Sequence, residues 1–252
     1  MILAVDVGNT STELALLNEA DGIVTDKYRY SSKEHRTADY HKNNIKKFAE
    51  AYSISAVIVS SVVPDINGFL DCACKELFDL NPVFVCADLT SGITVKYDNP
   101  QKLGTDLIAA AAGAVCKYGA PVIVVDIGTA TTFSVVNDKK EYLGGLIAPG
   151  PVTSMKALAS MTAQLSSVKL EVNNRVIGTN TADCINIGTV TAHAAMIDGM
   201  LQRVKESLGM PDVKVIATGG FSKDLLPICE QNLIYDENLI FAGLYQIYKL
   251  NL

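Results

Sequence analysis

The chain has 252 residues, of which 49% are hydrophobic and 19% charged, with a net charge of −6 at pH 7. This composition is typical of a folded globular protein and excludes extensive disorder. The balance of 21 basic and 27 acidic residues gives no electrostatic footprint for nucleic acid, and no apolar stretch approaches the roughly 18–20 residues that cross a bilayer.

The chain start and the cysteines favour an intracellular protein. The opening Met-Ile-Leu-Ala-Val reaches Asp6 too soon, and without a basic region, for a signal peptide. The six cysteines have neither paired CxxC spacing nor the density of a disulfide framework, and three histidines make a zinc site improbable. We therefore predict a cytoplasmic protein with reduced thiols, no membrane association and no nucleic-acid partner.

Hydrophobic periodicity divides the chain into alternating strands and helices. The first thirty residues predict a three-stranded meander at 2–6, 11–17 and 22–30. The elements predicted after it are a helix at 39–52, a strand at 56–61, a helix at 65–77, a strand at 83–86, a loop at 88–101, a helix at 103–118, a second meander over 121–148, helices at 151–164 and 181–208, a strand at 213–217 and a helix at 238–249. This order predicts an α/β fold in which a mixed sheet flanked by helices is built twice.

One short motif occurs twice, each time after an apolar run. Residues 6–12 read Asp-Val-Gly-Asn-Thr-Ser-Thr, and residues 126–132 read Asp-Ile-Gly-Thr-Ala-Thr-Thr. Carboxylates hold Mg²⁺, glycines let backbone N–H groups approach phosphate, and hydroxyls bind phosphate oxygens. Either acid alone could simply cap a tight turn. The duplication instead favours a nucleotide site between two halves, with phosphoryl oxygens contacted by Asn9, Thr10, Thr129, Thr131 and Thr132.

Asp106 is a third candidate acid, at the head of an apolar helix after Gly104 and Thr105. An acid in a first helical turn often only complements the helix dipole. Its place near the predicted junction of the halves also suits a base that takes the proton of a substrate hydroxyl.

A further turn, at 218–220, reads Thr-Gly-Gly after a predicted strand. Such a turn could lie against an adenine or a ribose, although strand-Gly-Gly-helix turns are common. The glycines at 144–145 and 150 are likewise mainly turn formers that could also permit the close approach of a ligand.

Together these motifs resemble the actin, sugar-kinase and Hsp70 ATPase superfamily, and within it the type III pantothenate kinases, the first enzymes of coenzyme A synthesis. The matching stretches run in family order over nearly the whole chain: Asp6-x-Gly8-Asn9-Thr10, Tyr97-x-Asn99-Pro100-x-x-Leu103-Gly104-x-Asp106, Asp126-x-Gly128-Thr129-Ala130-x-Thr132, Gly144-Gly145-x-Ile147-x-Pro149-Gly150, Ile177-Gly178-x-Asn180-Thr181, Thr218-Gly219-Gly220 and Asn238-Leu239-x-x-x-Gly243-Leu244. Each stretch is short, but the set is specific.

The resemblance implies two ribonuclease H-like (actin-like ATPase) domains, each a mixed sheet flanked by helices, with the active-site cleft between them. The halves are expected at 1–102 and 103–252. The implied reaction is ATP-dependent phosphorylation of pantothenate to 4'-phosphopantothenate, with Mg²⁺ and a monovalent cation, K⁺ or NH₄⁺. A homodimer with its active site at or near the subunit interface is implied as well.

The resemblance also implies a role for each matching residue. Asp106 would be the catalytic base, Asp126 would lie at the monovalent cation, and Asp6 would hold Mg²⁺ directly or through water. ATP and its phosphates would be bound by Asp6, Gly8, Asn9, Thr10, Gly128, Thr129, Thr132, Thr218, Gly219 and Gly220. Pantothenate would be bound by Tyr97, Gly104, Thr105, Asp106, Leu107 and Thr181, with Thr181 reaching into the partner subunit's pocket.

Leu107 departs from the family pattern, which has an arginine after the aspartate. That arginine is expected to hold the pantothenate carboxylate, and losing a charge-assisted contact weakens binding by about 1.5–3 kcal/mol. Lys102 or a residue of the other subunit could compensate, or leucine could simply pack the helix. Leu107 therefore leaves two alternatives open, a related kinase for another small hydroxylated acceptor and a non-catalytic nucleotide-binding regulator.

Overall fold

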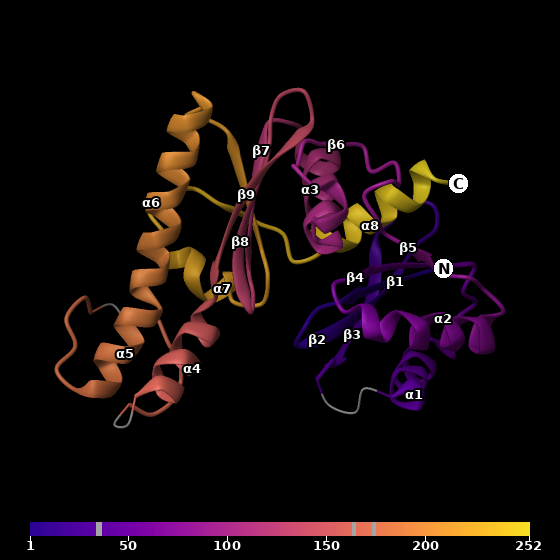
Figure 1. The fold of residues 1–252 in the computed structure, drawn as a ribbon, viewed down its shortest axis with the longest axis horizontal. Helices are drawn as coiled ribbons and strands as arrows, with labels where there is room; N and C mark the ends of the chain where they lie inside the picture. The colour runs from indigo at the N-terminus through magenta and orange to yellow at the C-terminus, as the bar shows by residue number, and fades with distance from the viewer. Residues whose placement is uncertain (34–36, 163–164, 173–174) are drawn as a thin grey trace. The chain divides into compact units, whose positions relative to one another are not determined.

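The chain forms two mixed β-sheets with helices packed against them (Figure 1). The structure is a computed structural model that describes residues 1–33, 37–162, 165–172 and 175–252. The chain divides into two compact units, the first of Met1–Ala120, Val136–Leu143 and Asn238–Leu252, and the second of Pro121–Val135 and Gly144–Glu237. The expected halves at 1–102 and 103–252 stay a prediction, because a division of the chain into compact units does not test where the two ATPase-like halves begin and end.

The first sheet has five strands in the order β3-β2-β1-β4-β5. These strands are β1 (Ile2–Val7), β2 (Ser11–Leu17), β3 (Val24–Ser31), β4 (Ala56–Ser61) and β5 (Val83–Phe84). β1 is central, antiparallel to β2 and parallel to β4. The first meander is therefore confirmed, and the apolar runs of β1 and β2 are explained by burial on both faces.

Helices cover both faces of this sheet (Figure 1). On one face lie α1 (Ala38–Ala49) and α2 (Pro64–Phe78), and on the other α3 (Thr105–Tyr118) and α8 (Leu239–Leu250). Against α1 and α2 the core gathers fully buried side chains such as Leu3, Leu14, Ile45, Ile66 and Leu70.

The helices α3 and α8 cross at two glycines. A Cβ on Gly113 would overlap the carbonyl oxygen of Leu239, and a Cβ on Gly243 would overlap the carbonyl oxygen of Ala109. Both helices carry small residues here because their backbones touch.

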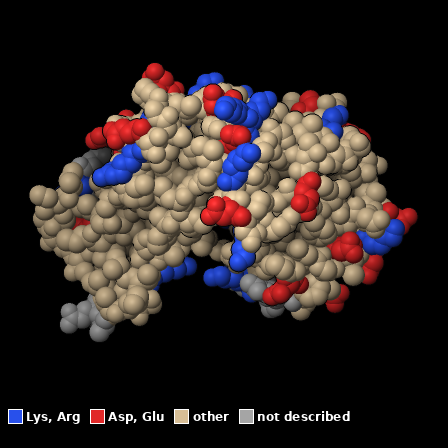
Figure 2. Space-filling model, turned by 45° about the horizontal axis from the view of Figure 1, so that its top comes forward, with Lys and Arg blue, Asp and Glu red and all other residues tan. Residues whose placement is uncertain are grey.

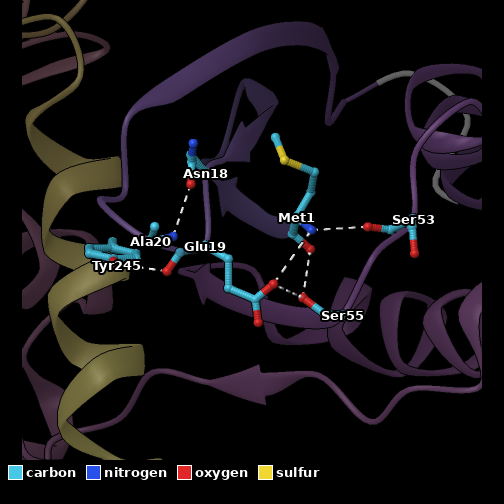
Figure 3. Close-up of polar contacts among 7 residues, drawn as sticks. All are labelled: Met1, Asn18, Glu19, Ala20, Ser53, Ser55 and Tyr245. Carbon is cyan, nitrogen blue, oxygen red and sulfur yellow. Dashed lines mark hydrogen bonds and ion pairs between the residues drawn. The ribbon is translucent and has the colours of Figure 1, made fainter.

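The turn between β2 and β3 is held against α8 (Figure 3). The Tyr245 hydroxyl donates to the carbonyl oxygen of Glu19 at 3.1 Å, and the Tyr245 ring fills the space beside Gly22, whose φ is +72°. The side chain of Asn18 accepts the Ala20 N–H at 2.9 Å. This turn is thus fixed by a helix more than 200 positions later in the sequence.

The second sheet has six strands in the order β11-β10-β7-β8-β9-β6. These strands are β6 (Thr94–Val95), β7 (Val122–Ile127), β8 (Ala130–Val136), β9 (Glu141–Pro149), β10 (Lys214–Thr218) and β11 (Ile234–Tyr235). The remaining elements are α4 (Pro151–Met161), α5 (Thr181–Thr189), α6 (Thr191–Leu208), α7 (Ser222–Leu225) and the 3₁₀ turns η1 (Pro100–Lys102) and η2 (Leu226–Ile228). The long helix α6 packs Ala194, Ile197 and Leu201 against the strand residues Ile123 and Val125.

Two sequence predictions were wrong. The single helix expected at 181–208 is two helices, broken at the buried Val190 within a run of β-branched residues that disfavours helix. The loop expected at 88–101 contains β6 and the start of η1, because Thr94 donates to the carbonyl of Lys140 at 2.9 Å, a partner distant in sequence. The predicted helix at 151–164 ends at Met161, and its positions 163–164 lie outside the described residues.

Candidate active site

The two duplicated aspartates occupy equivalent places in their sheets. Asp6 is the fifth residue of the six-residue β1, and Asp126 is the fifth residue of the six-residue β7. The two strands have the same burial pattern, four buried residues followed by a half-buried aspartate and a buried apolar residue. The repeat predicted from sequence is therefore a repeat of structure.

Beyond the aspartates the two copies differ by one residue. The Gly8 N–H donates to the carbonyl of Ser11 at 3.0 Å, and the Gly128 N–H donates to the carbonyl of Ala130 at 2.9 Å, so the second turn is one residue shorter. The strands that follow, β2 and β8, again share one burial pattern. Thr12 and Thr131 are thus equivalent, and both are fully buried. The phosphoryl contact predicted for Thr131 is therefore wrong, because its side chain faces the core and not the loop surface.

The first loop exposes Asn9 and Thr10 to solvent. Its backbone is fixed by the residue that follows β3, because the Ser32 N–H donates to the carbonyl of Thr10 at 3.0 Å. The Ser32 hydroxyl also lies 2.9 Å from the Thr12 hydroxyl. Rigid backbone beneath exposed polar side chains is a suitable arrangement for phosphate.

The second loop is held from the end of β9 and the start of α4. The carbonyl of Thr129 accepts the Gly150 N–H at 3.0 Å and the Thr153 hydroxyl at 2.6 Å. A Cβ on Gly150 would overlap the carbonyl oxygen of Gly128. Gly150 was only a weak signal in the sequence. Its lack of a side chain is explained by this close approach to the backbone of Gly128.

The Thr-Gly-Gly turn lies directly against Asp126. Thr218 pairs with Asp126 across β10 and β7, and the Asp126 carboxylate occupies the place that a Cβ on Gly219 would take. Gly219 has φ +94°, a conformation that favours glycine. Within the second unit, Asp126, the loop at 128–129 and the turn at 218–220 therefore lie at the ends of the neighbouring strands β7 and β10.

Asp106 stands at the start of α3, and its carboxylate folds back over Gly104. One carboxylate oxygen accepts the Leu107 N–H at 2.8 Å and fills the space where a Cβ on Gly104 would lie. Burial raises the pKa of Asp106 above its ordinary value, and the hydrogen bonds from the backbone only partly offset this. A carboxylate of raised pKa is a stronger base than an ordinary aspartate.

Thr105 ties the start of α3 to the sheet. Its hydroxyl lies 3.1 Å from the Ser60 hydroxyl and accepts the Ser61 N–H at 2.9 Å. Ser60 pairs in register with Asp6 across β4 and β1. Asp106 and Asp6 are therefore carried by elements joined by direct hydrogen bonds within the first unit.

The other residues predicted to bind pantothenate are less enclosed. Tyr97 is 42% exposed and meets Tyr142 edge to face at 6.4 Å between ring centroids. Leu107 is half-buried on α3. Thr181 is exposed at the start of α5, where the Asn180 side chain caps the helix by accepting the Asp183 N–H at 2.9 Å.

Within the described residues, no three His, Cys, Asp or Glu side chains gather as a ready-made metal site. This does not conflict with Mg²⁺, which is commonly held by one or two carboxylates together with substrate phosphates. Asp6, beside the first loop, is the aspartate predicted to hold Mg²⁺. On the face drawn in Figure 2, charged residues of both signs are interspersed.

A family model for type III pantothenate kinases matches residues 2–203. A type III pantothenate kinase from Halalkalibacterium halodurans is 35% identical over the whole of both chains. The chain belongs to the type III pantothenate kinase family. The resemblance seen in the motifs is thus confirmed.

Solved structures confirm the actin-like kinase fold for this type III pantothenate kinase family member. A conserved protein from Campylobacter jejuni, described as a candidate Baf family transcriptional activator, superposes with a TM-score of 0.61 at 21% identity, covering 98% of this chain and 97% of that one. A ROK family glucokinase from Streptomyces griseus, solved with glucose and AMPPNP, gives 0.54 at 14% identity, covering 99% and 98%. At such identities the likeness concerns the fold alone. In the described part of the chain no helix has the length and apolarity to cross a bilayer.

The sequence motifs did not identify the residues whose hydrogen bonds hold the loops in place. Ser60, Thr153 and His193 each hydrogen-bond a predicted site residue or its neighbour from a distant part of the chain. A single serine, threonine or histidine carries no local pattern, so only the fold could identify these residues.

Proposed function

We propose that this chain transfers the γ-phosphoryl group of ATP to the primary hydroxyl of pantothenate, the first step of coenzyme A synthesis. The observation that carries this proposal is family membership over 2–203 together with full-length similarity to a type III pantothenate kinase. The hydrogen bonds that join the start of α3 to β4, the strand next to that of Asp6, support the same reaction.

Asp106 is the proposed base. It accepts the proton of the pantothenate hydroxyl while that oxygen bonds to the γ-phosphorus and the bond to the β-γ bridging oxygen breaks, which releases ADP. The raised pKa of the half-buried Asp106 supports this role. Phosphoryl transfer depends mainly on positioning and charge stabilisation, so Gly104 and Thr105 contribute by fixing where this carboxylate lies.

Both loops are proposed to bind the triphosphate. Asp6, Gly8, Asn9 and Thr10 form the first phosphate loop. Gly128, Thr129 and Thr132 form the second, and Thr218, Gly219 and Gly220 bind the nucleoside side. Exposed hydroxyl and amide groups on backbone fixed by Ser32, Gly150 and Thr153 support these roles.

Two cations complete the proposal. Asp6 would hold Mg²⁺, directly or through water, and the ion would supply positive charge beside the phosphates. Asp126 would lie at a monovalent cation, K⁺ or NH₄⁺, and the close packing of its carboxylate on Gly219 would hold that carboxylate in place.

For the acceptor pocket we propose Tyr97, Gly104 and Leu107 as lining residues, with the Thr105 hydroxyl holding the helix start. Thr181 completes the pocket of the partner subunit in a cytoplasmic homodimer. The exposure of Tyr97 and Thr181 supports these roles, since ligand-binding side chains must be accessible.

A coupled assay of ADP release tests the reaction. Purified protein, Mg²⁺-ATP and K⁺ are incubated with pantothenate or with a panel of other small alcohols. We expect turnover with pantothenate and its loss in Asp106→Asn. Turnover only with another alcohol would redirect the proposal to a different acceptor, and nucleotide binding without any turnover would favour a regulator.

A further inference from the structure

A buried threonine follows each phosphate loop. Thr12 and Thr131 are the second residues of β2 and β8, and neither side chain is exposed. A buried hydroxyl needs a hydrogen-bond partner, because leaving it unpaired is unfavourable. The partner of each threonine therefore matters for the loop beside it.

In the second unit this partner is a histidine from α6. The Thr131 hydroxyl lies 2.8 Å from Nε2 of His193, a residue only 8% exposed. Burial lowers the pKa of His193, which keeps the imidazole neutral near neutral pH. A neutral imidazole nitrogen can donate to the hydroxyl or accept from it, so the bond persists in either tautomer.

Thr131 connects the core to the loop. It lies two residues after Thr129, whose carbonyl is held by Gly150 and Thr153, and one residue before Thr132. Neighbouring residues of a strand point to opposite faces. A rotation of the strand at Thr131 would therefore turn Thr132 as well and shift the loop against its contacts at Thr129.

The first unit repeats this arrangement with different partners. Thr12 bonds Ser32 at 2.9 Å and stands opposite Tyr30 across β2 and β3. The Tyr30 hydroxyl lies 3.1 Å from Nδ1 of the fully buried His41 on α1. A buried histidine thus stands behind both hairpins, in contact with Thr131 in one and with the cross-strand partner of Thr12 in the other.

We propose that His193 is a positioning residue of the second phosphate loop, acting through its hydrogen bond to Thr131. This inference rests on the proposed function, because it takes the loop at 128–132 as a phosphate site. Removal of the bond leaves a polar group buried and unpaired, and the start of β8 rotates to relieve it. The loop then binds the triphosphate less well although the fold is intact.

Calorimetric titration with Mg²⁺-AMPPNP tests this without requiring turnover. Thr131→Val keeps the shape and removes the hydroxyl, and we expect its Kd to rise about fivefold to thirtyfold. Thr131→Ser keeps the hydroxyl and should bind within about twofold of the wild type. His193→Gln can place a hydrogen-bonding atom near the Nε2 position and should bind more tightly than His193→Ala.

Thr189→Val is the matched control. Thr189 is a threonine of the same unit that is 3% exposed, and its hydroxyl has no hydrogen-bond partner among the described residues. Its replacement by valine should leave the Kd for AMPPNP unchanged. If Thr131→Val lowers the melting temperature but binds AMPPNP as Thr131→Ser does, His193 is only a core residue and the proposal is overturned.

The two proposals fail separately. A chain that binds AMPPNP with the expected variant pattern but does not phosphorylate pantothenate would disprove the proposed acceptor and leave the role of His193 standing. If pantothenate is phosphorylated, Thr131→Val should raise the KM for ATP and leave the KM for pantothenate unchanged. Equal changes in both constants would contradict a specific effect on the phosphate loop. If His193→Ala does not fold, the comparison of Thr131→Val with Thr131→Ser tests the proposal instead.

Discussion

The Asp106 carboxylate lies in the space that any side chain at Gly104 would occupy. Gly104→Ala must therefore displace the proposed base. We expect kcat to fall about a hundredfold, because small misplacements of reacting groups have effects of this size, while the KM for ATP changes little. Steady-state kinetics with each substrate varied in turn measure both constants. An unchanged kcat would mean that the observed position of Asp106 is not the reactive one.

The raised pKa of Asp106 predicts opposite effects of pH on activity and stability. Activity requires the ionised carboxylate, so kcat/KM for pantothenate, which reports ionisation of the free enzyme, falls as the pH drops through a pKa that lies above the ordinary 3.8. Stability behaves differently, because a raised carboxyl pKa means that the folded chain binds the proton more tightly than the unfolded chain. The free energy of unfolding therefore decreases as the pH rises between the two pKa values and stays lower above them.

Asp106→Asn removes this ionisation and tests both effects. We expect the variant to be inactive but to melt at a higher temperature than the wild type at pH 7, with a difference that narrows toward pH ~4. Calorimetric melting curves across this range provide the measurement. A variant less stable than the wild type at pH 7 would show that the charged form of Asp106 is stabilised by the fold.

Leu107→Arg should improve pantothenate binding. A guanidinium at this position can form charge-assisted hydrogen bonds to the substrate carboxylate, which corresponds to a fall in the KM for pantothenate of about tenfold to a hundredfold. Leu107→Lys is the matched control and should give a smaller fall, because an ammonium cannot form the bidentate contact. If Leu107→Arg leaves the KM unchanged, another residue already holds the carboxylate.

Gly219→Ala should damage the ATP site, and Gly209→Ala is its control. Both glycines have positive φ, +94° and +64°, but a Cβ on Gly219 would overlap Asp126 and Ile127, whereas a Cβ on Gly209 has open space. Both variants carry backbone strain of about 1–2 kcal/mol. Only Gly219→Ala should also raise the KM for ATP, as measured at saturating pantothenate. An equal effect of both variants would contradict a role for the Gly219–Asp126 contact.

Much of the fold was predictable because its strands are apolar runs bounded by turn residues. The duplicated Asp-x-Gly motif predicted two equivalent hairpins, which the matching burial of β1 and β7 confirms. The pairing of β6 was not predictable, since its partner Glu141 is distant in sequence. Nor was the break at Val190, since a short run of β-branched residues disfavours a helix only weakly.

In the candidate site, too, residues that belong to local motifs were predictable, and contacts between distant parts of the chain were not. Asp6, Asp106 and Asp126 stand out because acids at strand ends and helix starts form local motifs. The catalytic role of Asp106 and the cation-binding roles of Asp6 and Asp126 stay predictions. The equivalence of Thr12 with Thr131 was hidden, because one loop is a residue shorter than the other. The bond between Thr131 and His193 joins residues 62 positions apart, so only the fold could bring them together.

The most direct test of the central claim is the identity of the product. Mass spectrometry of a reaction with purified protein, Mg²⁺-ATP, K⁺ and pantothenate should detect 4'-phosphopantothenate and an equal amount of ADP, and neither with Asp106→Asn. Protein that binds ATP but forms no phosphopantothenate over many hours would contradict the proposed function.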